Sequence, residues 1–212
     1  MHLLRLLLLT VFAALPAHAQ SDPAGKFDYY VLSLSWSSNW CSLTGDARHD
    51  PQCDPGRGLT FIAHGLWPQY EHGYPSDCRT TASDPSRADT AALADIMGGA
   101  GVAFHEWQKH GRCSGLSSQD YYKTLRRAYM SVTIPPVFAR INKDLHVDAS
   151  VIQDAFLERN PQLSADQITV TCTSGMIQEV RICLTKDLSP RICGPDVIHD
   201  CNLSDAELDA VR

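Results

Sequence analysis

The chain has little positive charge and no visible basic stripe. It contains 18 Lys and Arg residues against 24 Asp and Glu residues, a formal charge of −6 over 212 residues. Tight, sequence-independent binding of nucleic acid needs many contacts between basic side chains and phosphates. The composition therefore weakens a nucleic-acid packaging function more than a catalytic one, because a catalytic site needs only a local positive pocket.

A long apolar run is also missing beyond the N-terminus. Met1–Arg5 supplies a short positive start, Leu6–Leu15 is apolar, and Ala17-His18-Ala19 ends in small residues. This pattern predicts a signal peptide at 1–19 and an exported domain at 20–212, periplasmic or extracellular. A membrane anchor is disfavoured, because a spanning helix needs roughly 20 apolar residues. We expect no association of the exported domain with a membrane.

The chain has no CxxC pair, which argues against a zinc ribbon or a redox motif. All eight cysteines follow the predicted cleavage point, and their number is even. In a chain bound for an oxidising compartment this predicts four disulfides. The residues alone leave the pairing open.

No repeat and no regular βαβ alternation is present, which favours an α+β domain over a doubly wound sheet. Alternating apolar residues predict strands, and helical spacing predicts helices. We expect a single domain with a central, mainly antiparallel sheet flanked by helices and stapled by disulfides. The expected strands are Phe27–Trp36, Leu59–Ala63, Ile168–Cys172 and Met176–Leu184, the last two forming a hairpin; the expected helices are Ser86–Met97, Gln119–Val132 and Ser150–Glu158, and Thr44–Gly58 is an expected loop.

Two short segments concentrate unusual residues. Residues 61–68 (FIAHGLWP) place a histidine at the end of a predicted strand, and residues 104–113 (FHEWQKHGRC) hold two more. If the second segment is helical, Glu106 and His110 share one face, and His105 and Lys109 lie four apart on the neighbouring face. Gly111 is then well placed to end the helix.

This constellation suits proton transfer. A nearby carboxylate raises the pKa of a histidine and orients its ring, so we expect Glu106 to do this for His110. His64 can supply the second proton-transfer group. The alternatives are a solvated polar helix face and a histidine hydrogen-bonded in the core. A zinc protease is disfavoured because its motif places the histidines four apart, whereas His105 and His110 are five apart.

At this point the chain resembles a known family. His64-Gly65-Leu66-Trp67-Pro68, followed about forty residues later by His105-Glu106-Trp107 and Lys109-His110-Gly111, is similar to the two active-site segments of the ribonuclease T2 family. The opening strand and the order of the cysteines also look like that family. The resemblance implies an endoribonuclease with low base specificity that acts without a cofactor or metal.

The resemblance also implies residue roles. His110 would be the general base and His64 the general acid, with Glu106 and Lys109 stabilising the transition state and His105 binding phosphate. The products would be 2′,3′-cyclic phosphates and then 3′-phosphates, and DNA would not be cut. The implied base site contains Trp67, Tyr74 and, more loosely, Tyr70; Gln69 stands where an acidic residue is common.

The family's cysteine order implies the pairs Cys41–Cys53, Cys78–Cys113, Cys172–Cys201 and Cys183–Cys193. We expect a monomer with RNA as substrate. The main alternative is a catalytically silent, secreted RNA-binding protein on the same scaffold. The remaining histidines, His49, His72, His146 and His199, have no such neighbours and are expected on the surface.

Overall fold

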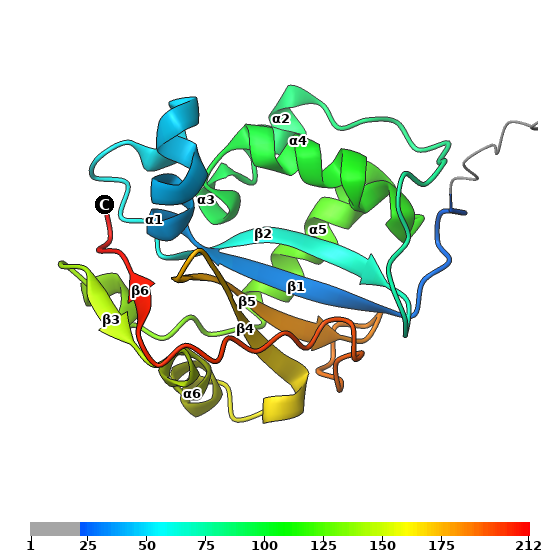
Figure 1. The fold of residues 1–212 in the computed structure, drawn as a ribbon. Helices are drawn as coiled ribbons and strands as arrows, with labels where there is room; N and C mark the ends of the chain where they lie inside the picture. Colours follow the sequence, from blue (N-terminus) through cyan, green and yellow to red (C-terminus); the bar gives the residue numbers. More distant parts are fainter. Residues whose placement is uncertain (1–21) are drawn as a thin grey trace, which may run out of the picture.

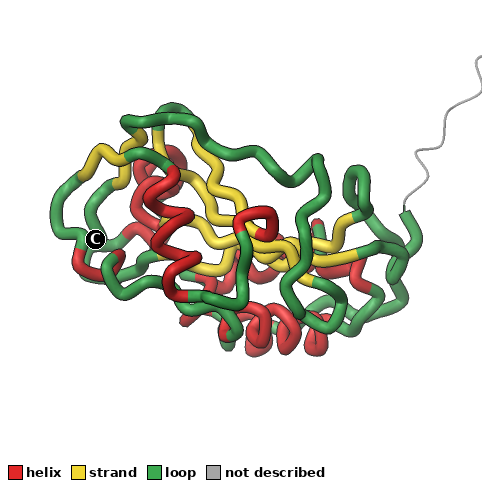
Figure 2. The backbone as a smooth tube through the Cα atoms, turned by 90° about the horizontal axis from the view of Figure 1, so that it is seen from below, coloured by secondary structure: helices red, strands yellow, loops and turns green. Residues whose placement is uncertain are grey.

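The computed structural model describes residues 22–212, so the predicted signal peptide at 1–19 lies outside the described residues. A mixed sheet runs through the middle of the domain, and helices lie at its periphery (Figures 1 and 2). The strands are β1 (Tyr29–Trp36), β2 (Phe61–Gln69), β3 (Leu145–Val147), β4 (Ile168–Thr173), β5 (Met176–Leu184) and β6 (Ala206–Leu208). The expected α+β class is confirmed.

The sheet is mainly antiparallel. Its path is β2-β1-β5-β6-β3, and β4 pairs with β5 outside that path. All ladders are antiparallel except a single parallel contact between β5 and β6. The predicted hairpin is confirmed: β4 and β5 are joined through Ser174 and Gly175, both with positive φ, as a tight two-residue hairpin turn requires. The short strands β3 and β6 were not predicted.

The two faces of the sheet differ in character. Tyr30, Leu32, Leu34 and Trp36 of β1 point into the main apolar core, as alternation along a strand requires. The opposite face of β1 carries Tyr29, Val31, Ser33 and Ser35. Residues that pair across neighbouring strands point to the same face of a sheet. Alternate residues of β2 and β5 therefore lie on this second face as well. It is the face on which the candidate site lies.

Helices cover the apolar face and the edges of the sheet. They are α1 (Ser37–Trp40), α2 (Arg87–Ala91), α3 (Ala94–Met97), α4 (Ala100–Lys109), α5 (Ser118–Met130) and α6 (Ser150–Arg159). Figure 1 places α4 and α5 beside β1 and β2, and α6 beside β3 and β4. The buried aromatics Trp36, Phe61, Phe138 and Phe156 pack tilted or edge to face at 5.0–5.9 Å. Each such burial contributes about 1.5–3 kcal/mol.

The predicted helix at Ser86–Met97 is broken in two. Its start is as expected, because Ser86 and Asp89 form a capping box. The break follows Ala91. The amide of Ile96 bonds to the carbonyl of Leu93 rather than to that of Ala92, its partner in a continuous helix. Arg126 donates to the freed carbonyl of Ala92 at 2.7 Å. The predicted helices near residues 119–132 and 150–158 are confirmed as α5 and α6.

The second predicted strand was placed too early and too short. It was expected at Leu59–Ala63, but β2 begins at Phe61 and continues through Gln69, so His64 lies within the strand. β2 continues through Gly65 and Pro68 because it is an edge strand, where proline is tolerated. The expected loop 44–58 contains short helical turns, including Asp46–Arg48 and Pro51–Cys53.

All four disulfides implied by the cysteine order are present: Cys41–Cys53, Cys78–Cys113, Cys172–Cys201 and Cys183–Cys193. Removing such a bridge from a small exported domain typically costs about 2–5 kcal/mol. Within residues 22–212, every helix is too short or too polar to reach across a bilayer.

Candidate active site

A β-bulge aims His64 at the site. Ser33 of β1 pairs with Gly65 of β2, and the next residue, Leu34, pairs with Ala63. His64 is therefore the extra residue of β2 and has no partner on β1. Bulges bend a strand locally and redirect a side chain, and they are common beside active sites.

Two carboxylates flank the His64 ring. Its Nδ1 lies 2.6 Å from Oε1 of Glu179 on β5, and its Nε2 lies 3.6 Å from Oε1 of Glu106 on α4. Burial lowers the pKa of the imidazole, but the hydrogen bond to Glu179 and the charges of Glu106 and Glu179 outweigh it. The pKa of His64 therefore lies above its ordinary value, and the protonated form is favoured.

Glu106 is buried against β2 rather than against His110. Its Oε2 accepts a hydrogen bond from Nε1 of Trp67 at 2.7 Å. A β-carbon added at Gly65 would lie 2.0 Å from the same oxygen, so only glycine fits beneath the carboxylate. Burial raises the pKa of Glu106, against the lowering effects of His64 and Trp67. The carboxyl group therefore sits between the two segments that the sequence singled out.

His110 ends α4 in a non-helical conformation, with φ −120° and ψ −45°. The expected pairing of Glu106 with the His110 ring is wrong, because Glu106 contacts Trp67 and His64 instead. The centroid of the His110 ring lies 5.2 Å from that of Trp67. Burial, followed by the charges of Lys109, His64 and His105, lowers the pKa of His110 to about 3. The expected rise in its pKa is also wrong. His110 is neutral near pH 7, and its buried Nδ1 has no hydrogen-bond partner among residues 22–212.

Two basic side chains of α4 face the same cleft. His105 and Lys109, four residues apart as expected, are both exposed and line the site. Burial and then the charges of Lys109 and His64 lower the pKa of His105. Gly111 does not end the helix as expected, because α4 stops at Lys109 and Gly111 opens a 3₁₀ turn. A β-carbon at Gly111 would instead clash with buried aromatic rings.

These groups surround one cleft of about 340 Å³. It is lined by Val31, His64, Trp67, Gln69, Tyr74, His105, Glu106, Lys109, His110, Gln178, Glu179, Arg181, Asp196, Val197 and His199. Tyr74 is 57% exposed at its rim, whereas Tyr70 packs against the apolar core and does not line the cleft. In the part of the chain that the structure describes, no three His, Cys, Asp or Glu side chains are grouped to hold a metal ion.

A sequence profile of the ribonuclease T2 family matches residues 27–201, which include the whole cleft. The chain belongs to the ribonuclease T2 family. A ribonuclease of Aeromonas hydrophila is 44% identical over 100 residues, a match that covers 47% of this chain and 44% of that protein. The chain spans about half the length of the first curated relatives it matches.

Solved structures with the ribonuclease T2 fold resemble the domain closely. Trichomaglin, described as an S-like ribonuclease, superimposes with a TM-score of 0.70 at 19% identity, over 88% of this chain and all of that chain. RNase NT, solved in complex with 5′-AMP, gives a TM-score of 0.65 at 21% identity, over 87% of this chain and 99% of that chain. At this identity the likeness shows the fold.

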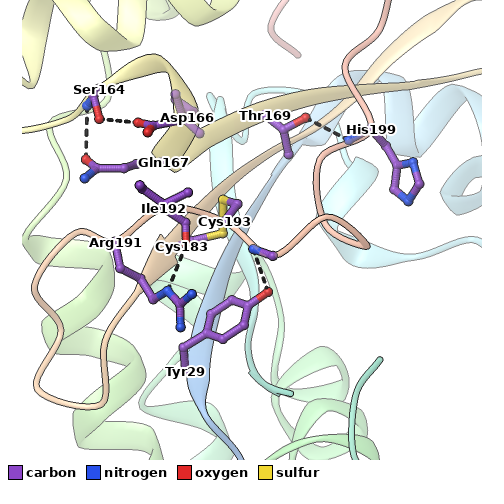
Figure 3. The surroundings of a disulfide bond; sticks show 12 residues. Tyr29, Ser164, Asp166, Gln167, Thr169, Cys183, Arg191, Ile192, Cys193 and His199 are labelled. Atoms are coloured by element: carbon purple, nitrogen blue, oxygen red, sulfur yellow. Dashed lines mark hydrogen bonds between the residues drawn. A yellow bond between two sulfur atoms is a disulfide. The ribbon is translucent and has the colours of Figure 1, made fainter. Parts of the chain in front are cut away.

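Disulfides hold the outer wall of this ribonuclease T2 cleft. Cys78–Cys113 ties the chain after β2 to the turn after α4, as expected. Cys183–Cys193 and Cys172–Cys201 enclose the segment 193–201, which supplies Asp196, Val197 and His199 to the cleft. Figure 3 shows this segment fixed further, because the Tyr29 hydroxyl accepts from the amide of Gly194 at 3.1 Å and the Thr169 hydroxyl accepts from the amide of His199 at 3.3 Å.

The structure adds site residues that sequence reasoning missed. Glu179 and Arg181 lie on β5, far along the chain from both motifs, and reach the cleft with His199. His199 is exposed, as expected for a surface residue, yet it faces the cleft. One signal was available: two charged residues, two positions apart, interrupt the mostly apolar strand Met176–Leu184. Such a pair marks one face of the strand as polar.

Proposed function

We propose that this protein is an exported endoribonuclease that cleaves single-stranded RNA by transesterification, with His64 and His110 as its proton-transfer pair. The observation that carries the proposal is that one cleft holds two histidines in opposite surroundings: His64 lies between two carboxylates, whereas the buried Nδ1 of His110 has no hydrogen-bond partner among residues 22–212. Charged neighbours favour the proton on His64, while burial removes it from His110. General acid–base catalysis needs one group in each state.

In the first step neutral His110 takes the proton of the 2′-hydroxyl group. The 2′-oxygen attacks phosphorus, the bond from phosphorus to the 5′-oxygen breaks, and protonated His64 gives its proton to that leaving oxygen. The products are a 2′,3′-cyclic phosphate and a free 5′-hydroxyl. Because DNA has no 2′-hydroxyl group, this step leaves DNA uncut.

In the second step the two histidines exchange roles. His64, now neutral, takes a proton from water, and the water oxygen attacks phosphorus. The bond to the 2′-oxygen breaks, and His110, now protonated, returns a proton to it. The product is a 3′-phosphate, and both histidines regain their starting states.

The remaining groups of the cleft stabilise the charge that develops on phosphorus. Lys109 supplies positive charge, and His105 supplies a hydrogen-bond donor, for the phosphoryl oxygens. Glu106 lies 3.6 Å from Nε2 of His64, the ring nitrogen that is not engaged by Glu179. No step of this scheme draws on a metal ion or another cofactor.

The base site is built for stacking. Trp67 contacts the rings of His64 and His110 and the guanidinium of Arg181, whereas exposed Tyr74 stands at the rim, where a base can contact its aromatic plane. Stacking of this kind contributes about 1–3 kcal/mol per base and tolerates every base. We therefore propose low base specificity.

We also propose that the protein is exported. The four disulfides suit an oxidising compartment, and the signal-like pattern at 1–19 would direct the chain there. All proposed catalytic groups belong to one chain, which is compatible with a monomer. RNA is the proposed partner, and no DNA or membrane partner is proposed.

The test is cleavage of a mixed-sequence RNA and its DNA equivalent with chelator present. We compare the wild type with His64→Ala, His110→Ala and the control His146→Ala, an exposed histidine outside the cleft. We expect the wild type and the control to cut RNA alone, leaving cyclic or 3′-phosphate ends, and the two site variants to be inactive. RNA binding without cleavage by the wild type would instead support the silent RNA-binding alternative.

A further inference from the structure

One buried carboxylate of the cleft has no role in the scheme above. Glu179 lies on β5, and its side chain is almost fully buried on the site face of the sheet. Both of its oxygens are engaged: Oε1 contacts Nδ1 of His64 at 2.6 Å, and Oε2 accepts from Nε of Arg181 at 2.8 Å. The guanidinium adds a second contact at 2.7 Å. Glu179 therefore links the side chain of Arg181 to the ring of His64.

The sheet leaves room for this chain of contacts. Neighbouring strands lie about 4.8 Å apart, so β2 and β5 are about 10 Å apart with β1 between them. On β1, Ser33 pairs with Arg181, and Ser35 pairs with Glu179. Both serines are small and buried, so a glutamate on β5 can reach over β1 to the histidine at the bulge of β2. Larger residues at these two positions would separate the carboxylate from the ring.

We propose that Glu179, held by Arg181, is a positioning residue for His64. Resting on the ribonuclease function proposed above, the inference assigns Glu179 the task of keeping the proton of neutral His64 on Nδ1. An ionised carboxylate can only accept a hydrogen bond, so the nitrogen that faces it carries the hydrogen. Nε2 is then the atom that exchanges protons with the substrate, on the side where Glu106 lies 3.6 Å away.

The pKa values of the two carboxylates beside His64 are shifted in opposite directions. Burial raises the pKa of Glu179, but the bond and charge of His64 together with Arg181 reverse this, and its pKa falls to about 2. The pKa of Glu106 is raised by its burial. Glu179 is therefore the permanent negative charge beside the ring. The charged and titratable groups that line the cleft with His64 are His105, Glu106, Lys109 and His110 from α4 and its end, Glu179 and Arg181 from β5, and Asp196 and His199 from the C-terminal segment. A neighbouring pocket that His64 also lines adds Arg48, Asp50 and Arg57 from the segment before β2.

A structural role alone does not explain the arrangement well. Replacing a buried ion pair by apolar residues of similar volume is often neutral or stabilising. The rest of β5 is mostly apolar, so two aliphatic residues would suit its packing. The Glu179–Arg181 pair instead directs one carboxylate oxygen to His64, which indicates that Glu179 acts on this histidine.

Two substitutions with opposite expected effects test the proposal. Glu179→Gln removes the charge that holds the proton on His64. The alkaline limb of the kcat/KM profile therefore shifts to lower pH by about one unit or more, and kcat/KM on that limb falls about tenfold. Arg181→Gln removes the charge that opposes protonation, so the same limb shifts to higher pH. A role in stability alone would lower activity evenly across pH in both variants.

The second readout is the titration of the His64 ring nitrogens by NMR, assigned by loss of the signal in His64→Asn. We expect the hydrogen of neutral His64 on Nδ1 in the wild type, a lower pKa in Glu179→Gln and a higher one in Arg181→Gln. An unchanged His64 titration and tautomer in Glu179→Gln overturns the positioning role, even if the wild type cuts RNA. If Glu179→Gln does not fold, the test rests on Arg181→Gln. The positioning role is then overturned if neither the alkaline limb of the kcat/KM profile nor the pKa of His64 moves to higher pH in that variant.

The two readouts separate this proposal from the function on which it rests. A wild type that fails to cut RNA refutes the proposed function, while the NMR titration still reports whether Glu179 controls the His64 proton. A wild type that cuts RNA with an unmoved alkaline limb in both variants refutes only the role of Glu179. Rescue is checked with Glu179→Asp, which keeps the charge and is expected to hold the limb closer to the wild-type position than Glu179→Gln does.

Discussion

Gly65 packs tightly against the carboxylate of Glu106, and Gly65→Ala tests whether the site depends on this close packing. The added methyl group would lie 2.0 Å from Oε2 of Glu106 and 2.3 Å from Nε1 of Trp67, the two atoms of one buried hydrogen bond. Breaking a hydrogen bond to a charged group costs about 1.5–3 kcal/mol. Overpacking adds about 1–3 kcal/mol. We therefore expect a destabilisation of about 3 kcal/mol or more.

The effect on activity is expected to be larger than the effect on folding. Displacing Glu106 also moves a neighbour of His64, and a misplacement of about 1 Å can cost about a hundredfold in rate. Urea unfolding gives the free energy, and cleavage of single-stranded RNA gives kcat/KM. The control is Gly101→Ala in α4, where the new methyl group meets nothing within 4 Å and the change is expected to be neutral or slightly stabilising. A Gly65→Ala protein as stable and active as the control would refute the close-packing argument.

Three further predictions follow from the same geometry. The pH–rate profile is expected to be bell-shaped: activity falls below about pH 3 as His110 becomes protonated, and it falls again above the raised pKa of His64 as that group loses its proton, so a profile still rising at pH 9 contradicts the assignment. Replacing both Cys78 and Cys113 by alanine is expected to lower the free energy of unfolding by about 2–5 kcal/mol, and an unchanged urea midpoint would argue against this. Trp67→Phe keeps an aromatic face but loses the indole donor, so kcat should fall more than KM rises; the reverse pattern in steady-state kinetics would make Trp67 a base-binding residue only.

Local patterns in the sequence were enough for much of the fold. Alternation in β1, the Ser174-Gly175 turn of the hairpin and the capping box at Ser86 were all readable, because each depends on residues close together in the chain. The cysteine pairs were predictable only through the family resemblance. The break after Ala91 was not readable, since its carbonyl network depends on an arginine from another helix.

The site was only partly predictable for the same reason. The motifs identified His64 and His110 as candidates, yet their environments depend on contacts across the sheet. The bulge at His64 arises from the register of β1 against β2, and Glu179 reaches it from 115 positions along the chain. Helical spacing suggested that Glu106 serves His110, but the helix ends one residue too early for that pairing. Register and helix termini decide such contacts, and neither follows from spacing alone.

The division of the sheet into an apolar face and a site face has a consequence for how this scaffold can diverge. Tyr74 and His199 stand on the rim of the cleft, exposed and separated by the sheet from the main apolar core. Surface substitutions of this kind usually change stability by less than about 0.5 kcal/mol. Substitutions in the proposed base site can therefore accumulate one at a time at the rim, without the compensating repacking that changes in a shared core and site would demand.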